Sequence, residues 1–519
     1  MSTHDPNLQH RGVLPVVLLS LALVVAAVPA LNVALPDVAA STDASMSQLQ
    51  WVVDAYALVF AGLLLPAGAL GDRYGRKPVL VAGLAIFAAG AGLAALSSTP
   101  TALIGLRGLM GVGAALVMPT TLSIITSSFP REQRGKAVGA WIGVAGAGAV
   151  FGLLTSGLLL EVWAWQSVFW FSAALGLAVA VLAVRLIPNS RDENSPRVDY
   201  VGGLLSVLTL VGVVFAAIEG PERGWTDPLT LGAFAVGTLG LLAWVAWGLV
   251  AKDPLLDPRL FARRDFSTGV LSITLQFFVF FGFIFLVVQY VQLVLGYSAL
   301  QAGLALIPMA MVLGGLSRKV PHLATKVSRR PLAVTGLALM GLGMLVLTQL
   351  DAGSSYWLLL AGILPVGAGM ALATAPATTD IVSALPPSKQ GVASAVNDAA
   401  REVGGTLGIA VLGSILNQQY RSGVTEAAPA SAPDGIVDGA RESLAAALGI
   451  ASHLGDAGLS LASGARLAFV DGMGFAFLTS AGVLFATAAV LLVAIPGRKA
   501  APAAADAHEE EAGELVDAR

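Results

Sequence analysis

The chain has 519 residues, of which 56% are hydrophobic and only 12% are charged, and its mean hydropathy is +0.80. Soluble proteins carry about 25% charged residues, so this composition excludes an ordinary soluble protein and indicates a polytopic membrane protein. The formal net charge is only −3, so the positions of the charges matter more than their sum. The absence of cysteine excludes disulfides, thiolate zinc sites and cysteine nucleophiles.

The chain is predicted to cross the membrane many times. Residues 1–12 are polar, with neither a basic leader nor a small-residue cleavage site, so we expect a cytoplasmic N-terminus rather than a signal peptide. About 20 apolar residues span the hydrocarbon core, and such stretches recur almost to the end of the sequence. On this basis about fourteen spans are predicted, at residues 13–35, 51–70, 79–97, 101–126, 137–159, 166–187, 200–218, 229–250, 266–290, 298–316, 332–350, 356–380, 392–416 and 467–495.

Positive charge orients these spans. Clusters of lysine and arginine occupy the loops after even-numbered spans, whereas the loops after odd-numbered spans hold only Arg223, Arg421, Arg441 and Arg466. Cytoplasmic loops are the ones enriched in lysine and arginine. Both termini are therefore predicted to be cytoplasmic, and the alternation favours an even number of spans.

Three segments outside the spans have compositions of their own. Residues 417–466 are rich in Ala, Ser and Gly and are predicted to form a long external segment, with an amphipathic helix near residues 440–455. Residues 254–264 are expected to form a short interfacial helix on the cytoplasmic face. The tail at residues 496–519 is acidic and rich in alanine, so we expect it to be disordered and cytoplasmic.

Two charged residues lie within otherwise apolar spans. Asp54 is a few residues inside the outer end of the second span, and Arg107 lies inside the fourth. A charged side chain is expensive in a membrane and marks a functional site by default. A medium of low polarity favours a neutral carboxyl group, so Asp54 is expected to bind a cation when charged and release it when protonated. The alternative for Asp54 is an interfacial carboxylate that stays hydrated.

The guanidinium of Arg107 cannot remain unpaired within the membrane. We expect it to pair with the carboxylate of Asp54 or with backbone groups of the first span. Since arginine does not lose its proton, its role would be to bias a carboxylate. The alternative is a purely structural connection between helices.

A third group of charges opens the thirteenth span. Asp398, Arg401 and Glu402 are spaced i, i+3 and i+4, so the two carboxylates share a helix face. Arg401 can neutralise one of them, which leaves the other free to bind a proton or a cationic ligand. The alternative is a neutral surface cluster at the cytoplasmic mouth. Asp380, at the inner end of the twelfth span, is a weaker candidate for the same kind of role.

Five motifs follow one another along the chain. They are Leu31-Asn-Val-Ala-Leu-Pro36, Trp51-Val-Val-Asp-Ala-Tyr56, Gly71-Asp-Arg-Tyr-Gly-Arg-Lys77, Arg107-Gly-Leu-Met-Gly-Val-Gly-Ala-Ala115 and the segment from Asn397 to Gly405. With them the chain resembles the major facilitator superfamily, and specifically its fourteen-span drug:proton antiporters, which include quaternary-ammonium exporters. The resemblance covers nearly the whole chain.

The resemblance implies an all-α integral membrane protein with the major facilitator fold, in which two six-helix halves are joined by two additional central helices. We expect the N-terminal half at residues 13–187, the additional helices and linkers at 188–265, and the C-terminal half at 266–495. A weak internal repeat agrees, because the turn at Gly71–Pro78 has a degenerate counterpart in Gly314–Lys319 followed by Arg329–Pro331. Transporters built from repeats place the substrate site between them.

The turn between the second and third spans is expected, by resemblance, to latch the two halves in the outward-open state. Its residues are Gly71, Asp72, Arg73, Gly75, Arg76 and Lys77. Glycine permits the backbone conformations of a tight turn. Asp72 can accept hydrogen bonds from Arg73, Arg76 or the N-terminus of a neighbouring helix. The alternative is a basic anchor that only orients the protein.

The resemblance also supports roles in proton coupling or substrate binding for the charged residues within the spans, Asp54, Arg107, Asp398 and Glu402. Four aromatic residues are expected to line a cavity that accepts amphiphiles of varied shape, namely Tyr56, Trp141, Phe281 and Tyr290. Ordinary helix packing is the alternative for each aromatic residue.

Two positions depart from the family pattern. The segment Gly152-Leu-Leu-Thr-Ser-Gly157 differs at Leu153 and Ser156 from the Gly-Pro-x-x-Gly-Gly signature of exporters, and Ala27 replaces an acidic residue that is frequent in the first span. These departures weaken the inference of export and leave the proton stoichiometry open.

The predicted function is a proton-coupled multidrug efflux antiporter, a monomer that exports hydrophobic or cationic small molecules across the cell membrane and has no nucleic-acid partner. The alternatives are a dedicated exporter of one endogenous metabolite or antibiotic, an uptake permease and a non-transporting membrane sensor. The sequence has no Gly-x-x-x-x-Gly-Lys-Ser/Thr loop, which argues against an ATP-driven pump. Its five histidines are scattered and form neither a metal site nor a triad, so no enzyme activity or cofactor is expected.

Overall fold

The computed structural model describes residues 6–42, 44, 46–188, 190, 199–427, 434–454 and 456–494. Over these residues the chain is helical and contains no strand. Thirteen of the described helices are long and apolar enough to cross a membrane, and a fourteenth is obtained when α5 (Arg131–Leu160), which bends by 48°, is counted as one span. The predicted all-α membrane architecture is therefore confirmed.

The N-terminal half consists of six helices that pack around one another. They are α1 (Pro6–Thr42), α2 (Met46–Tyr74), α3 (Arg76–Ala95), α4 (Pro100–Ser128), α5 and α6 (Gln166–Leu186). Helix α4 packs against both α2 and α3, while α1 packs against α5. Small residues permit such close packing in lipid. A methyl group on Gly113 of α4 would lie 2.6 Å from the carbonyl oxygen of Gly83 on α3.

The C-terminal half has six long helices. They are α9 (Arg264–Gln289), α10 (Ala299–Ser317), α12 (Arg329–Leu347), α13 (Tyr356–Ser383), α14 (Gln390–Ala427) and α17 (Asp456–Ala494), with short α11 (Val320–Lys326) between α10 and α12. Their packing repeats that of the first half. Helix α13 packs against α10 and α12 as α4 packs against α2 and α3, and α14 packs against α9 as α5 packs against α1. This correspondence agrees with the weak repeat seen in the sequence.

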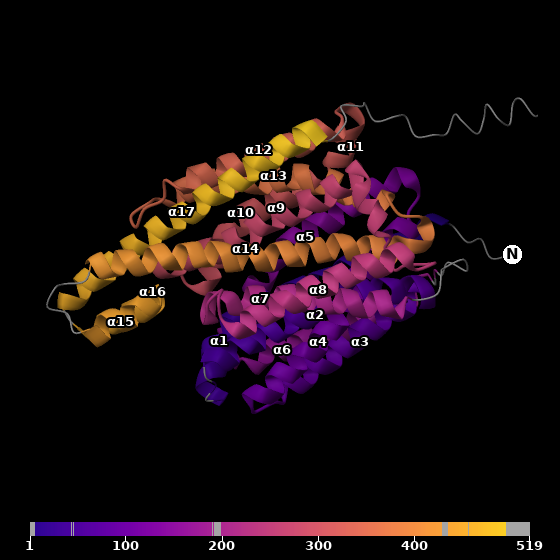
Figure 1. Ribbon diagram of the computed structural model, residues 1–519. Coiled ribbons are helices and arrows are strands. Elements are labelled where there is room, and N and C mark those ends of the chain that lie inside the picture. The colour runs from indigo at the N-terminus through magenta and orange to yellow at the C-terminus, as the bar shows by residue number, and fades with distance from the viewer. Residues whose placement is uncertain are drawn as a thin grey trace, which may run out of the picture.

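The two halves meet mainly along two pairs of helices. Helix α5 packs along α10, and α2 packs against α14, which lies between the indigo N-terminal half and the remaining C-terminal helices in Figure 1. Glycines again allow a short distance between the helices. A methyl group on Gly143 of α5 would lie 3.1 Å from the Cα of Gly314 on α10. These two seams form most of the contact between the halves.

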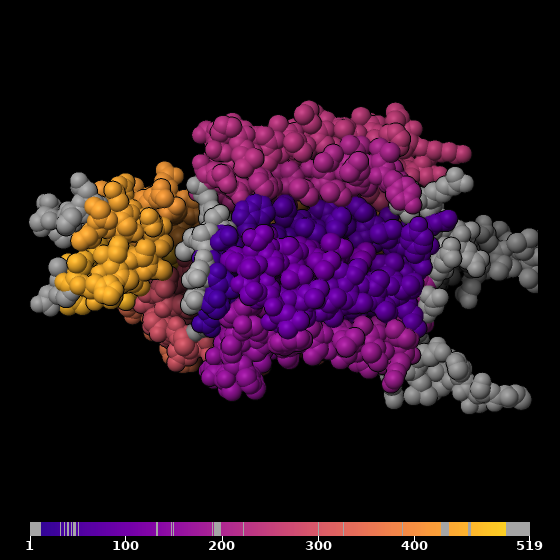
Figure 2. All heavy atoms as spheres, turned by 90° about the horizontal axis from the view of Figure 1, so that it is seen from below, coloured from indigo at the N-terminus to yellow at the C-terminus, as the bar shows by residue number. Residues whose placement is uncertain are grey.

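The two additional helices form a hairpin on one flank of the molecule. Helix α7 (Tyr200–Arg223) packs against α8 (Pro228–Val250), and it also contacts α2 of the first half and α14 of the second. Figure 2 shows the pair as a magenta layer along the indigo N-terminal half. Asp199 caps α7 by accepting a hydrogen bond of 2.8 Å from the backbone of Gly202. Helix α7 therefore contacts both halves.

The segment predicted as a long external loop is largely helical. Helix α14 runs for 38 residues, about 57 Å at 1.5 Å per residue, and α17 runs for 39, so both extend well beyond a bilayer. Short helices α15 (Asp434–Glu442) and α16 (Leu444–Ala451) lie between them. The hydroxyl of Tyr420 donates to the Ala440 carbonyl at 2.9 Å. These elements form the orange and yellow projection in Figure 2. The prediction of one amphipathic helix at 440–455 was wrong in its bounds.

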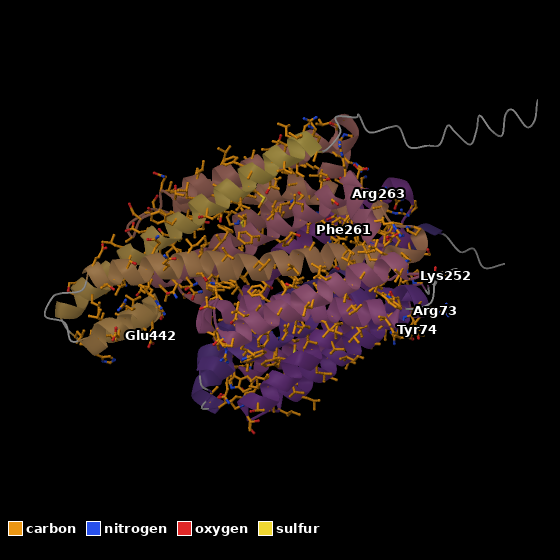
Figure 3. The ribbon with its side chains drawn as sticks, viewed as in Figure 1. Arg73, Tyr74, Lys252, Phe261, Arg263 and Glu442 are labelled. Atoms are coloured by element: carbon orange, nitrogen blue, oxygen red, sulfur yellow. The ribbon has the colours of Figure 1, made fainter. Side chains whose placement is uncertain are left out.

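Other boundaries also differ from expectation. Helix α1 begins at Pro6, so half of the predicted polar lead is part of a helix. The predicted interfacial segment contains the 3-10 helix η1 (Pro258–Ala262), and its last residue, Arg264, already begins α9. The predicted acidic tail at residues 496–519 lies outside the described residues. Figure 3 places Arg73 and Lys252 at one end of the molecule and Glu442 at the opposite end, as the charge alternation predicts.

Candidate functional site

A sharp turn separates α2 from α3 at the end of the molecule that carries the basic loops. Gly75 has φ 102° and ψ 141°, a conformation that is essentially restricted to glycine. The backbone N–H of Arg76 donates to the Ser190 carbonyl at 3.2 Å. The Arg76 side chain reaches back to the Asp72 carboxylate at 3.4 Å. The turn therefore holds Asp72 in a fixed position.

Asp72 joins the two halves. Its carboxylate accepts hydrogen bonds from the backbone N–H of Gly391, at 2.8 and 2.9 Å, and of Val392, at 3.2 Å. Both donors belong to the first turn of α14, where free N–H groups and the helix dipole favour a negative charge. The structure confirms two of the partners predicted for Asp72, a helix N-terminus and Arg76. Sequence analysis gave no sign of which helix it would be.

This contact requires the two helices to approach very closely. A methyl group on Gly391 would overlap the carbonyl oxygen of Gly68 and would lie 2.9 Å from the carboxyl carbon of Asp72. A methyl group on Gly68 would overlap the Gly391 carbonyl in turn. The pair of glycines brings the α14 N-terminus within hydrogen-bonding distance of Asp72. We call Asp72, Gly391 and Val392 the inner latch.

Arg107 is fully buried where α1, α2 and α4 meet. Its Nε donates to the Val52 carbonyl at 2.9 Å, and its guanidinium lies 4.5 Å from the centre of the Tyr56 ring. The Tyr56 hydroxyl donates to the Val24 carbonyl of α1 at 2.9 Å. The expected backbone partner from α1 was therefore wrong: the carbonyl comes from α2, and Tyr56 supplies the link to α1. Half-buried Asp54 lies within electrostatic range of Arg107.

The cluster that opens the thirteenth span is buried, which overturns the alternative of a surface cluster. Asp398 is 0% exposed and Arg401 is 4% exposed. Their charged groups lie 3.9 Å apart, and the Asn397 amide donates to Asp398 at 3.4 Å. Asn397 in turn accepts a hydrogen bond of 3.0 Å from Thr378 of α13. Glu402 is half-buried one turn further along α14.

Aromatic contacts connect this cluster to the N-terminal half. The guanidinium of Arg401 lies 4.4 Å from the centre of the Phe277 ring of α9 and 5.2 Å from that of Trp141 of α5. The Trp141 indole is fixed by a hydrogen bond of 2.9 Å to Thr121. Glu402 lies within electrostatic range of Tyr56. Contacts of a cation with an aromatic face are strong when desolvated, so Arg401 of α14 makes a charged contact with the other half.

Two guanidinium atoms in this region lack partners. Among the described residues, Nη2 of Arg107 and Nε of Arg401 are buried without a hydrogen-bond acceptor. Such atoms are rare in native structures. Both belong to side chains predicted as functional, and each can still donate a hydrogen bond.

Other predicted residues lie apart from this region. Asp380 forms an ion pair with Arg329 of α12, within the C-terminal half. The Tyr290 hydroxyl donates at 2.8 Å to the Asp351 carbonyl beyond α12, so this ring supports the C-terminal end of α9. Phe281 packs at 5.6 Å from Phe277 and is half-buried near the Arg401 cluster. Of the predicted cavity residues, Tyr56, Trp141 and Phe281 therefore lie near the charged groups, whereas Tyr290 does not.

Sequence reasoning missed a buried polar network in the C-terminal half. Gln276 of α9 donates to Ser272 at 2.6 Å and accepts from Thr374 of α13 at 2.9 Å. Gln276 is 0% exposed. A lone polar residue in an apolar span was the available signal, because polar groups inside a membrane are expensive and usually functional.

Comparison with known proteins places this arrangement in context. A family model described as Major Facilitator Superfamily matches residues 17–409. The multidrug efflux pump LfrA of Mycolicibacterium smegmatis is 35% identical over 440 residues, which cover 84% of this chain and 86% of that protein. The methyl viologen resistance protein SmvA of Salmonella typhimurium is 33% identical over 446 residues, covering 85% of this chain and 89% of that protein.

Solved structures show the same fold. A proton:xylose symporter, XylE, superposes with a TM-score of 0.60 at 15% sequence identity, and the match covers 95% of this chain and 97% of that one. At this identity the likeness concerns the fold, with its two six-helix halves.

Proposed function

Because this chain belongs to the major facilitator superfamily, we propose that it is a proton-coupled exporter of cationic and amphiphilic drugs in the cytoplasmic membrane. The names of the relatives, which refer to multidrug efflux and to methyl viologen resistance, support drugs as cargo. The observation that carries the proposal is the buried cluster of Asp398, Arg401 and Glu402, which contacts Trp141 of the opposite half.

Charge balance gives the cluster its chemistry. The described site holds three carboxylates, Asp54, Asp398 and Glu402, and two guanidiniums, Arg107 and Arg401. When all are ionised, one negative charge is in excess. An uncompensated charge in a medium of low polarity is expensive, so one proton or one monovalent organic cation stabilises the site. The two therefore compete for it, which is the requirement for exchange.

The inner latch supplies the conformational step. While Asp72 binds the α14 N-terminus, the inner ends of α2 and α14 are held together and the site is closed to the cytoplasm. Taking up cargo from inside requires this contact to break. Because Arg401 of α14 also lies against Trp141 of α5, a change of charge in the cluster alters a contact between the halves. Charge state and opening are thereby coupled.

The proposal includes an orientation and a driving force. The basic loops and both ends of the described chain lie at the end of the molecule that carries Arg73, which we assign to the cytoplasm (Figure 3). A membrane potential of about 100 mV supplies about 2.3 kcal/mol per charge. We further propose that a single copy of the chain is the functional unit.

The test uses inverted membrane vesicles that contain the protein, with ethidium as a fluorescent monovalent organic cation. A proton gradient, acidic inside, should drive ethidium into the vesicles, and a protonophore should abolish the uptake. Asp398→Asn and Glu402→Gln should each lose gradient-driven accumulation. Glu161→Gln, which alters an exposed carboxylate at the end of α5, is the matched control and should behave like the wild type.

Three results would contradict the proposal. Unchanged accumulation by the double variant of Asp398 and Glu402 would refute the role of the cluster. Accumulation that ignores the protonophore would refute proton coupling. Ethidium movement only in the opposite direction would favour an uptake permease. A panel of cations with different scaffolds would separate a multidrug exporter from one dedicated to a single compound.

A further inference from the structure

The loop that joins the two additional helices to the C-terminal half is held by side-chain hydrogen bonds. We call residues 251–263 the strap. The Asp199 carboxylate accepts hydrogen bonds from the Leu255 backbone at 3.0 Å and from the Trp247 indole at 3.0 Å. The Arg259 side chain donates to the Leu249 carbonyl at 3.2 Å. The strap is therefore tied to the inner ends of α7 and α8.

Two further contacts tie the strap to the C-terminal half. The Lys389 ammonium donates to the Pro254 carbonyl at 2.6 Å, and the Arg263 guanidinium donates to the Ala384 carbonyl at 3.1 Å. Ala384 is the C-cap of α13. Lys389 ends the short 3-10 helix η3 (Pro387–Lys389), immediately before α14 begins. The strap therefore holds the chain just ahead of the inner latch.

The surroundings of Lys389 are strongly acidic. Its half-buried ammonium lies within electrostatic range of Asp253, Asp199, Asp257 and Asp72. Burial lowers the pKa of Lys389, while these four carboxylates raise it. Among them is Asp72, the acceptor of the inner latch, so Lys389 places a positive charge where the strap and the latch meet.

We propose that Lys389 is a positioning residue of the inner latch and that the strap makes the α7–α8 hairpin part of the closed inner gate. The ammonium fixes the residues before α14, so that the N–H groups of Gly391 and Val392 stay aimed at Asp72. This inference rests on the latch role proposed for Asp72. It also gives the two additional helices a role in gating, because α7 packs against α2 while the strap holds the start of α14.

The packing of α7 explains why such a tie would matter. A methyl group on Gly62 of α2 would lie 2.6 Å from the side chain of Val211, so α7 packs closely against α2 of the N-terminal half. The strap continues directly from this hairpin, and it is bonded to the C-terminal half through Lys389 and Arg263. When α14 separates from α2, the hairpin must lose its contact either with α2 or with the start of α14. The Lys389 bond therefore opposes opening of the inner side.

The absence of cysteine makes a direct test convenient. Spin labels on Gln133→Cys at the start of α5 and Val327→Cys after α11, both exposed positions, report the separation of the halves at the inner end. Lys389→Met should raise the ratio of inner-open to inner-closed molecules by about tenfold, the effect of losing one hydrogen bond from a charged donor. Lys389→Arg, which keeps charge and donors, should restore most of the closed population.

Two controls separate the possible failures. Lys252→Met removes an exposed lysine from the same strap and should leave the distance distribution unchanged. Asp72→Asn should open the inner side on its own. If Asp72→Asn opens it and the well-folded Lys389→Met and Lys389→Arg variants both match the wild type, the inference about Lys389 is refuted while the latch stands. If Asp72→Asn has no effect, the latch itself is refuted, and the inference falls with it.

Discussion

Replacement of Gly391 by alanine tests the inner latch most directly. The added methyl group would overlap the Gly68 carbonyl and lie 2.9 Å from the Asp72 carboxyl carbon, where carbon atoms normally stay about 3.5–4.0 Å apart. Helices α2 and α14 must therefore separate by about 1 Å. The bond between Asp72 and the Gly391 N–H, now 2.8 Å, would then exceed the range of a hydrogen bond.

The magnitude follows from that lost bond. Hydrogen bonds to charged groups contribute about 1.5–3 kcal/mol, and each 1.4 kcal/mol changes an equilibrium about tenfold. Gly391→Ala should therefore shift the balance toward the inner-open state by about tenfold to hundredfold. The cysteine pair at positions 133 and 327 measures this shift, and drug export should slow because the closed inner state is rarely reached.

The matched control is Gly315→Ala in α10, where an added methyl group meets nothing within 4 Å. This variant should retain the wild-type distance distribution and export rate. A Gly391→Ala protein that keeps the closed inner state at wild-type abundance would refute the reasoning, because the steric overlap would then have no effect on the latch.

Three further predictions concern side chains near and far from the charged cluster. Arg107→Lys keeps the charge but loses the planar contact on Tyr56 and the Nε hydrogen bond to the Val52 carbonyl. Losing a hydrogen bond from a charged donor costs about 1.5–3 kcal/mol, so ethidium export in vesicles should fall at least tenfold. Normal export would contradict this prediction. Trp141→Phe keeps an aromatic face for Arg401 and should transport nearly normally, whereas Trp141→Ala should lower the export rate, and equal rates for the two would argue against the aromatic contact. Tyr290→Phe removes a hydrogen bond distant from the cluster. It should lower the free energy of unfolding by about 1 kcal/mol, measured by thermal unfolding, without changing export. A loss of export without a loss of stability would instead indicate that Tyr290 lines the cavity.

The sequence predicted the topology well because membrane burial depends on local composition. Apolar stretches of sufficient length, basic loops on alternate sides and the Gly71–Lys77 turn are all readable one segment at a time. The external segment was misjudged for the same reason. Hydropathy falls where α14 leaves the bilayer, but the helix continues to Ala427 because α-helical hydrogen bonding does not depend on lipid.

Sequence analysis was sufficient to predict an all-α membrane protein of this family and to identify Asp72, Arg107 and Asp398 as charged groups that need partners. Local partners, Arg76 for Asp72 and Arg401 for Asp398, could be predicted from spacing, whereas the partners on other helices became known only from the packing of the fold. Asp72 and Arg107 bind backbone groups, the Gly391 N–H and the Val52 carbonyl. Every residue has a backbone N–H or carbonyl, so such partners leave no trace in composition or spacing. Which of them comes within reach depends on how closely the helices pack.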